Sequence, residues 1–358
     1  MEAQPHKRRV RYRGTHPVRF EEKYKELQPE KYAETVEKVI RKGGTPAGMH
    51  RSIMVKEVLE ALCIQPGQQG LDATLGYGGH TKAMLEQLEG QGRIYALDVD
   101  QEEAEKTKQR LRGQGFGPEL LEIRLQNFSG LATLAEEVGG FDFVLADLGV
   151  SSMQIDNPAR GFSFKVDGPL DLRMDPRHGE PASVRLGELS REELAGCFVD
   201  NADEPYAEEI AAELLKRRRK GQRIETTTAL REAIKAAVCA VREVAVLPEE
   251  EQEETVKKSC ARVFQALRID VNHEYESLYA FLEALPQALR PGGHVAILTF
   301  HSGEDRLVKR AFKEGKKAGI YAEISEDVIR PSAEECFHNS RARSTKLRFA
   351  VKSNLVDH

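Results

Sequence analysis

The sequence predicts an α/β fold, in which a mostly parallel, Rossmann-like sheet is interrupted by a helical insertion. Two observations predict it. Between residues 53 and 150, short apolar segments alternate with helical segments of about 10 to 15 residues, which is typical of βαβ units. The alternation then gives way to a long helical stretch, and strand character returns only near residue 295.

The first half of the chain supplies the alternating elements. Strands are expected at residues 70–75, 93–98, 121–126 and 141–147. Helices are expected at residues 53–62, 81–88, 102–111 and 131–138. Because each helix returns the chain to start a strand parallel to the last one, these segments predict a mostly parallel sheet.

The insertion is helical in pattern, most clearly at residues 204–219 and 228–244. An acidic run follows, which we expect to be a solvated, mobile loop. Its members are Glu249, Glu250, Glu251, Glu253 and Glu254. Helical pattern returns near Ala261, and after a turn expected at residues 291–293, strands at 295–300 and 346–351 complete the sheet.

Basic residues lead the chain. Residues 1–44 hold 12 Lys and Arg against 7 Asp and Glu, a local charge of +5. Since the net charge of the whole chain is −5, the remaining residues carry −10. A Gly-Pro linker is expected at residues 43–46. We expect a basic extension and linker (1–48), a core in two segments (49–155 and 265–358) and an inserted helical substrate-recognition domain (156–264).

Composition excludes several classes of protein. The chain is 40% hydrophobic and 31% charged, as globular proteins are, and its apolar runs are far shorter than the ~18 residues of a membrane span. Its five cysteines are scattered, so we expect no disulfide framework, no structural zinc and no other metal. The N-terminus lacks the apolar core of a signal peptide, which predicts a cytoplasmic location.

A glycine loop follows the first predicted strand, where residues 72–80 read DATLGYGGH. Glycines at such a junction let the backbone approach a ligand, although a turn needed only for packing is the alternative. Asp98 and Asp100 end the next strand, where a carboxylate can bind ribose hydroxyls; a solvated carboxylate is the alternative, more so for Asp100. The loop lacks G-x-G-x-x-G spacing, which favours S-adenosylmethionine over NAD, because a methyl donor has no pyrophosphate.

The fourth predicted strand ends in Asp147, and small residues follow it. The carboxyl ends of parallel strands border the crevice in which open α/β sheets bind their ligands. Asp147 is therefore a candidate for the reaction site, with a buried capping role as the alternative.

Eight blocks of the chain, in order, resemble the bacterial ribosomal RNA small-subunit methyltransferase H family, also called MraW. They are residues 72–80, 98–100, 147–156, 160–164 (RGFSF), 168–175 (GPLDLRMD), 264–269 (FQALRI), 300–306 (FHSGEDR) and 343–348 (RSTKLR). The resemblance covers roughly residues 49–352. It implies a class I S-adenosylmethionine-dependent enzyme with a Rossmann-like core and a helical insertion, which methylates the exocyclic N4 of a P-site cytidine in 16S rRNA.

The resemblance also implies which residues bind S-adenosylmethionine. They are Gly78, Gly79, His80, Asp98, Phe128, Asp147 and Gln154. Phe128 would flank the adenine, with plain core packing as the alternative.

Methylation of a cytosine amine depends mainly on alignment, because the amine is a poor nucleophile and the donor is already activated. We expect Asp147, Ser151 and Ser152 nearest the transfer point. We expect the cytosine pocket to be shaped by Asp171, Arg173 and His301. The alternative for Asp171 and Arg173 is a structural ion pair, and the alternative for His301 is a histidine that hydrogen-bonds to the backbone. The base must leave its stack, and we expect it to be held by Arg160, Phe162 and Phe164, unless these pack against the insertion.

Two basic clusters are expected to contact RNA phosphates, with an ordinary solvated helix end as the alternative for each. The first is Lys216, Arg217, Arg218, Arg219, Lys220 and Arg223; the second is Arg341, Arg343, Lys346 and Arg348.

Three features depart from the family pattern. They are the N-terminal extension, Gly303 where the family usually has Leu, and residues 257–262 where it usually has a more basic segment. Deletion of residues 1–44 is predicted to weaken RNA binding and to leave cofactor binding intact. Two alternatives stay open: a methyltransferase acting on another RNA site or another acceptor, and a non-catalytic, S-adenosylmethionine-sensing ribosome-assembly factor. The expected partner is 16S rRNA in the small subunit, bound by a monomer or homodimer.

Overall fold

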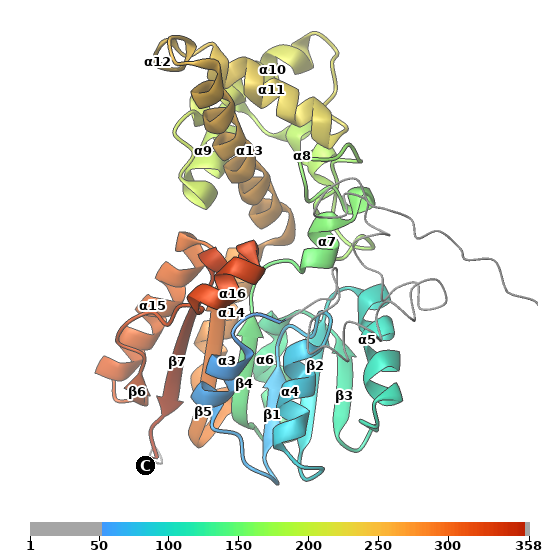
Figure 1. Ribbon diagram of the computed structural model, residues 1–358, viewed down its shortest axis with the longest axis vertical. Helices are drawn as coiled ribbons and strands as arrows, with labels where there is room; N and C mark the ends of the chain where they lie inside the picture. The colour runs from blue at the N-terminus through green and yellow to red at the C-terminus, as the bar shows by residue number, and fades with distance from the viewer. Residues whose placement is uncertain (1–51, 355–358) are drawn as a thin grey trace, which may run out of the picture. The chain divides into compact units, whose positions relative to one another are not determined.

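A seven-stranded sheet lies at the centre of residues 52–354, the part of the chain that this computed structural model describes (Figure 1). The strands are β1 (Gln69–Asp72), β2 (Arg93–Asp98), β3 (Leu121–Leu125), β4 (Phe141–Asp147), β5 (Leu289–Thr299), β6 (Tyr321–Ile324) and β7 (Lys346–Lys352). Their order is β3-β2-β1-β4-β5-β7-β6, and β7 is antiparallel to both its neighbours, whereas the other pairs are parallel. This is the arrangement of class I methyltransferases, which confirms the predicted fold class.

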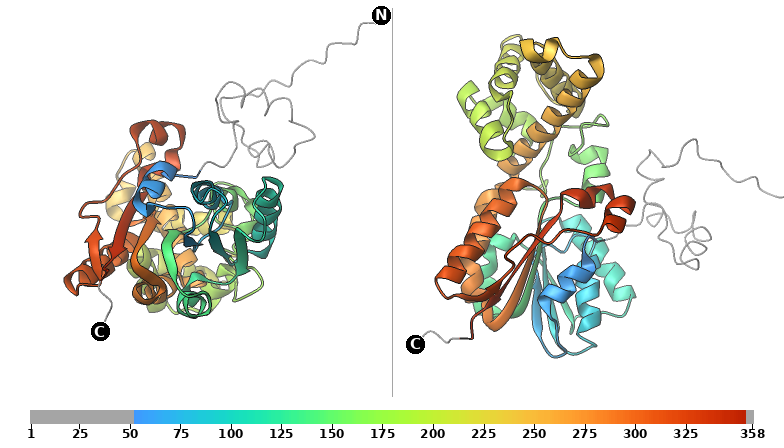
Figure 2. Two further views of the ribbon diagram at one scale, coloured as in Figure 1. Left: turned by 90° about the horizontal axis from the view of Figure 1, so that it is seen from below. Right: turned by 60° about the vertical axis from the view of Figure 1, so that its left-hand side comes forward.

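Helices cover both faces of the sheet (Figure 2). One face carries α3 (Val55–Leu62), α4 (Gly79–Gln87) and α5 (Gln101–Gly113); the other carries α6 (Leu131–Val138), α14 (Glu274–Ala288) and α15 (Ser302–Lys317). Along β4, Leu145 packs with the first set, whereas Val144 and Ala146 pack with the second. The central strands are therefore buried on both faces, which explains their continuous apolar sequences.

A third apolar cluster lies among the helices between β4 and β5. These helices are α7 (Ser152–Asp156), α8 (Ala182–Glu188), α9 (Arg191–Ala202), α10 (Ala207–Arg219), α11 (Thr227–Cys239), α12 (Arg242–Ala245) and α13 (Glu249–Asn272). The buried members of the cluster run from Phe162 to Leu267. Figure 1 places α8–α13 beyond the edge of the sheet at which α7 follows β4. The proposed insertion boundaries stay a prediction, and α13 continues without a break across residue 264.

The acidic run is not a loop, and that prediction was wrong. Its glutamates form the first turns of α13, where all five are exposed. Pro248 precedes the helix, and negative side chains near a helix N-terminus are stabilised by the helix dipole. The run therefore starts a helix of 24 residues that extends from the insertion toward the core.

Two further differences concern the edge of the sheet. Pairing between β4 and β5 jumps from Phe141–Leu289 to Phe143–His294, so residues 290–293 form a bulge inside β5 rather than a turn before it. Sequence analysis also missed β6 and α16 (Ala333–His338). The predicted linker at residues 43–46 and the basic extension lie outside the described residues. None of the helices in residues 52–354 is long and apolar enough to cross a membrane.

Candidate cofactor and transfer site

The loop between β1 and α4 is shaped by Asp72. The buried Asp72 carboxylate accepts hydrogen bonds from the Thr74 backbone N–H (3.0 Å) and from the Thr81 hydroxyl (2.6 Å). Burial raises the pKa of this carboxyl group. Asp72 thereby ties the start of the loop to the first turn of α4 and fixes its path.

The glycines of this loop serve two purposes. A Cβ atom on Gly78, where φ is +76°, would lie 2.7 Å from Thr107 Cγ2, and one on Gly79 would overlap Ser52 Oγ. Packing accounts for both, as the alternative interpretation proposed. Gly76 differs: its φ is +48°, and its Cβ side is open, with the nearest atom, the Thr74 carbonyl oxygen, at 3.9 Å. A ligand can therefore approach the backbone at Gly76.

Asp98 faces the same loop from the end of β2. One carboxylate oxygen accepts the Gly76 N–H and the other accepts the Asp100 N–H, both at 2.9 Å. Burial nevertheless raises the pKa of Asp98 to about 6. Since each oxygen keeps a free lone pair, the carboxylate can accept hydrogen bonds from the two hydroxyls of a ribose.

Asp100 has a structural role. It caps α5 by accepting the Glu103 N–H (3.2 Å), and its second oxygen accepts a hydrogen bond of 2.6 Å from Arg160. Arg160 also donates to the backbone carbonyls of Arg173 and Met174. The guanidinium group is thus engaged within the protein, and its predicted contact with RNA stays a prediction.

Asp147 and His80 meet at the opposite side of the loop. The Asp147 N–H donates to the Thr74 hydroxyl (2.7 Å), a contact that the sequence did not predict. His80 Nε2 lies 3.6 Å from Asp147 Oδ2. Burial by itself would lower the pKa of His80, but Asp147 and Asp72 outweigh it and raise that pKa. Asp147 Oδ1 and both His80 ring nitrogens are buried without a hydrogen-bond partner in residues 52–354.

Buried polar atoms without partners are rare in native proteins, and a bound ligand is one way to satisfy them. Here they lie against the same loop that carries Gly76 and donates to the Asp98 carboxylate. This set of groups fits S-adenosylmethionine: a carboxylate for its ribose, open backbone in the loop, and unpartnered acceptors and donors at the end of β4. Within residues 52–354, no three His, Cys, Asp or Glu side chains cluster as metal ligands would.

Comparison with known proteins identifies the family of the chain. The MraW methylase family matches residues 47–353. The chain belongs to this family. A relative from Agathobacter rectalis, named ribosomal RNA small subunit methyltransferase H 1, is 63% identical over 352 residues, 98% of this chain and 99% of the relative. A protein from Thermomicrobium roseum, named ribosomal RNA small subunit methyltransferase H, is 39% identical over 320 residues, 85% of this chain and 93% of its own. This MraW methylase is therefore a methyltransferase.

Ser151 and Gln154 form a capping box at the start of α7. The Ser151 hydroxyl accepts the Gln154 N–H (3.2 Å), and the Gln154 side chain accepts the Ser151 N–H (2.9 Å). Ser152 is the first residue of that helix. In this MraW methylase the two serines thus shape the turn directly after Asp147, and their expected place near the transfer point stays a prediction.

The three predicted rings take part in packing. Phe128 packs edge-to-face on Phe281 of α14, with centroids 5.4 Å apart. Phe162 is buried in the cluster of the insertion, and Phe164 packs against Phe264 of α13 at 5.6 Å. For Phe162 and Phe164 this is the packing alternative that the sequence left open.

Asp171 and Arg173 form an ion pair with two hydrogen bonds, of 2.7 and 2.9 Å, again as the alternative proposed. His301 occupies the N-cap position of α15, and its Nε2 lies 3.2 Å from the Glu304 carboxylate, at ion-pair distance. Burial opposes ionisation of Glu304, but His301 and Arg268 outweigh it and lower its pKa. Neither ring nitrogen of His301 has a hydrogen-bond partner in the described chain, so a backbone-satisfied histidine is not what the structure contains.

The second basic cluster is only partly accessible. Arg341 pairs with Asp156 (2.7 Å) and Arg348 with Asp305 (2.7 Å). Arg348 is 5% exposed, so its predicted contact with a phosphate is wrong. Lys346 lies 3.5 Å from Asp305, whereas Arg343 is exposed and makes no ion pair with another described residue.

The first basic cluster lies at the end of α10 and just beyond it. Arg217 and Lys216 both pair with Glu213, and Arg218 donates to the carbonyls of Gly187 and Leu189. The other members, Arg219, Lys220 and Arg223, are exposed. Basic residues at a helix C-terminus are stabilised by its dipole, so the helix-end alternative accounts for part of this cluster.

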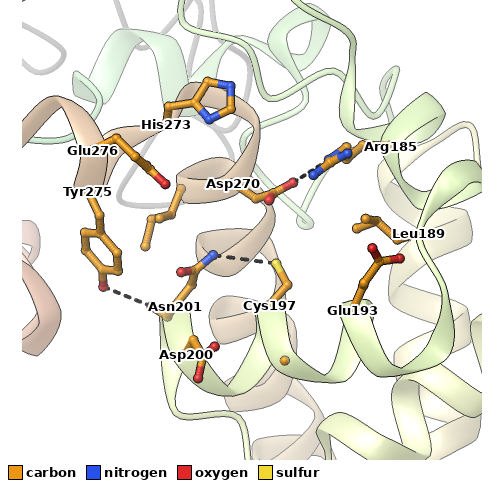
Figure 3. A pocket seen from close by; sticks show the side chains of 12 residues that line it. Arg185, Leu189, Glu193, Cys197, Asp200, Asn201, Asp270, His273, Tyr275 and Glu276 are labelled. Atoms are coloured by element: carbon orange, nitrogen blue, oxygen red, sulfur yellow. Dashed lines mark hydrogen bonds and ion pairs between the residues drawn. The ribbon is translucent and has the colours of Figure 1, made fainter.

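A cavity of about 370 Å³ lies between α9 and the junction of α13 and α14 (Figure 3). Arg185 and Asp270 form an ion pair at its wall, and the Tyr275 hydroxyl donates to the Asn201 carbonyl. Burial raises the pKa of the Cys197 thiol to about 12, which leaves it protonated. None of the residues predicted for the cofactor or the cytosine lines this cavity.

Proposed function

We propose that this MraW methylase transfers the methyl group of S-adenosylmethionine to the exocyclic N4 of a P-site cytidine in 16S rRNA. The observation that carries the proposal is the buried, unpartnered Oδ1 of Asp147 beside the glycine loop. The names of the relatives support small-subunit rRNA as the substrate class. The family resemblance of the eight sequence blocks supports N4 of cytosine.

On the donor side, Asp98 accepts the ribose hydroxyls, while the backbone at Gly76 and the first turn of α4 border the rest of the nucleoside. Gln154, 3.4 Å from Asp100, lies beside the same strand ends. The bound cofactor supplies a methyl group that its sulfonium already activates. The protein's contribution is to hold donor and acceptor in line.

On the acceptor side, the N4 amine must lose one proton when it becomes methylated. Its lone pair is delocalised into the ring, so a hydrogen-bond acceptor on N–H would help to localise it. Asp147 Oδ1 is such an acceptor, and His80, 3.6 Å from Oδ2, is the neighbour whose pKa this carboxylate raises. We assign Asp147 the contact with the amine, and Ser151 and Ser152 the shape of the turn that presents it.

For the substrate, we propose that Asp171, Arg173 and His301 border the cytosine, and that exposed basic residues such as Arg343 and Arg219 bind RNA phosphates. The protein would act in the cytoplasm on an assembled small subunit, as a monomer or homodimer. Residues 156–264 would form the substrate-recognition domain.

The test is methyl transfer from labelled S-adenosylmethionine to small ribosomal subunits that lack the N4 mark, followed by mass spectrometry of the digested nucleosides. We expect N4-methylcytidine, formed far more slowly in a reaction with Asp147→Asn. A different methylated nucleoside would move the proposal to another RNA site. Tight donor binding without any transfer would favour the assembly-factor alternative.

A further inference from the structure

Phe337 is the most exposed large apolar residue in the described part of the chain, with 82% of its surface accessible. It lies in α16, which sequence analysis missed. An exposed phenylalanine has no stabilising role in its own fold, because its ring gains nothing from burial there. Single exposed apolar residues are common, so its surroundings decide whether it has a function.

The segment that carries Phe337 is fixed at both ends to the candidate site. On one side, the Glu335 carboxylate accepts the Met54 N–H (2.9 Å) at the start of α3, two residues from the Ser52 that contacts Gly79. On the other side, Arg341 pairs with Asp156 at the end of α7 (2.7 Å). Residues 335–341 therefore bridge from the start of α3, beside the glycine loop, to the end of α7, the helix that follows Asp147.

The electrostatics place α16 near the same residues. Glu335 is one of the charges that raise the pKa of His80, the residue that faces Asp147. α16 also packs against the 3-10 helix η4 (Ser340–Ser344), which carries the exposed Arg343. Phe337 thus lies at the rim of the site, on a segment held by two independent contacts.

We propose that Phe337 stacks on an rRNA base next to the target cytidine, while Arg343 binds a neighbouring phosphate. The inference rests on the proposed function, which supplies the RNA. A splayed base needs a π-face to replace its lost stacking, and aromatic side chains flanked by cations provide it. Phe162 and Phe164, the rings expected from the sequence, are engaged in packing.

The composition of the segment favours RNA over a protein partner. A protein-docking surface is a contiguous apolar patch, whereas Phe337 stands among charged and polar side chains. Its ring contacts His338 edge-to-face, with centroids 5.4 Å apart and an interplanar angle of 90°. That contact restrains the ring from one side and leaves an exposed face for a base.

The test compares Phe337→Ala, Phe337→Leu and Phe337→Tyr in the full chain, by binding to small subunits that lack the mark. Alanine should weaken binding about 5- to 100-fold, the range for losing one base stack. Leucine should resemble alanine, since it keeps apolar area but has no π-face, whereas tyrosine should stay within about twofold of wild type. Affinity for S-adenosylmethionine should not change.

Ile320→Ala is the matched control. Ile320 is also exposed, but it lies directly before β6. This strand runs parallel to β5 and so begins at the opposite end of the sheet from the site. Arg343→Gln should lower the slope of log affinity against log salt by about one, whereas Phe337→Ala should leave that slope unchanged.

The outcomes separate this inference from the proposed function. If wild-type protein methylates the subunit but Phe337→Ala binds as tightly as wild type, the stacking proposal is wrong and the function stands. If Phe337→Leu binds like wild type, the contact is apolar docking to a protein instead. A photo-crosslinking phenylalanine analogue at position 337 should label 16S rRNA near the modified cytidine; labelling of ribosomal protein alone would overturn the proposal.

Discussion

Arg160 donates a 2.6 Å hydrogen bond to Asp100, and this pair joins the segment that enters the helical insertion to the end of β2. Both side chains are largely buried, Asp100 almost completely. Because Arg160 also binds the carbonyls of Arg173 and Met174, one guanidinium group fixes three segments that border the site.

Arg160→Ala should therefore act through stability. Removal of one partner leaves the Asp100 carboxylate buried and uncompensated, which costs about 3 kcal/mol of unfolding free energy. We expect that loss in urea unfolding, together with weaker S-adenosylmethionine binding, since Asp100 lies two residues after Asp98 and its N–H donates to the Asp98 carboxylate.

Arg343→Ala is the matched control for Arg160, because both arginines were predicted to contact RNA. It should leave the unfolding free energy unchanged within about 0.5 kcal/mol, as expected for an exposed side chain. Equal stabilities for the two variants would show that the Arg160–Asp100 pair does not hold the structure together.

Asp98 predicts a pH dependence of cofactor binding. Its pKa is about 6 in the free protein, and only the ionised carboxylate accepts hydrogen bonds from two ribose hydroxyls. Affinity should therefore rise from pH 5 to pH 7 and then level off, being about tenfold weaker at pH 5 than at pH 8. Calorimetric titration of wild type and Asp98→Asn checks this, because the variant should bind weakly at every pH and lose the dependence.

The same raised pKa predicts that the stability of the cofactor-free protein changes with pH in the opposite direction to cofactor affinity. The folded pKa of Asp98 is higher than its unfolded value of about 3.8, so the folded state binds more protons between these two pH values. The contribution of Asp98 to stability therefore falls as the pH rises from about 4 to 6. In the absence of cofactor, Asp98→Asn should melt at a higher temperature than wild type at pH 7 and show no such gain at pH 4.

Asp147→Asn tests the transfer step. The amide keeps the size of the side chain. Depending on its orientation, it presents to the amine either an NH2 group, which donates, or a carbonyl oxygen, which is a weaker acceptor than a carboxylate. Turnover should fall by about 100-fold, the lower range for a lost proton-accepting group, while the unfolding free energy stays near that of wild type. Retention of both turnover and cofactor affinity would refute the assignment of Asp147.

Much of the core could be predicted from the sequence for a physical reason. β2, β4 and α6 were predicted at their observed bounds, because strands buried on both faces give continuous apolar runs between polar ends. β6 was missed because it is a short strand at the sheet edge with two exposed residues, Ala322 and Glu323, at its centre. Local sequence carries no signal for such a strand, whose position depends on pairing with β7.

The candidate site was predictable where it depends on strand ends. Asp98 and Asp147 are the last residues of the parallel strands β2 and β4, so topology brings them to one edge of the sheet. The partners of Arg160 and Arg348 were not predictable, because Asp100 and Asp305 are 60 and 43 residues away in the chain. Residue type suggested RNA binding for both arginines, and long-range packing assigned them to internal ion pairs.

Gly303, where the family pattern has Leu, is explained by Tyr275. A Cβ atom at position 303 would overlap the Tyr275 hydroxyl. That hydroxyl donates to the Asn201 carbonyl of α9 (3.3 Å), and burial raises its pKa to about 12, so it stays a donor (Figure 3). The Tyr275 ring also lies 6.0 Å from the His301 ring. Glycine at position 303 thus makes room for a hydrogen bond between α14 and the insertion.

The contact between Gly303 and Tyr275 predicts that the effect of Gly303→Leu on the unfolding free energy changes sign when Tyr275 is removed. In wild type, Gly303→Leu should destabilise the protein by about 1 to 2 kcal/mol, because it displaces Tyr275 from Asn201. In a Tyr275→Ala background the overlap with Tyr275 is removed and only His301 Cε1, 3.2 Å from the new Cβ, stays close, so leucine's higher helix propensity in α15 should stabilise the protein by about 0.5 kcal/mol. Urea unfolding of the four proteins measures the coupling. The same sign in both backgrounds would mean that Gly303 is required by the path of α15 itself and not by Tyr275.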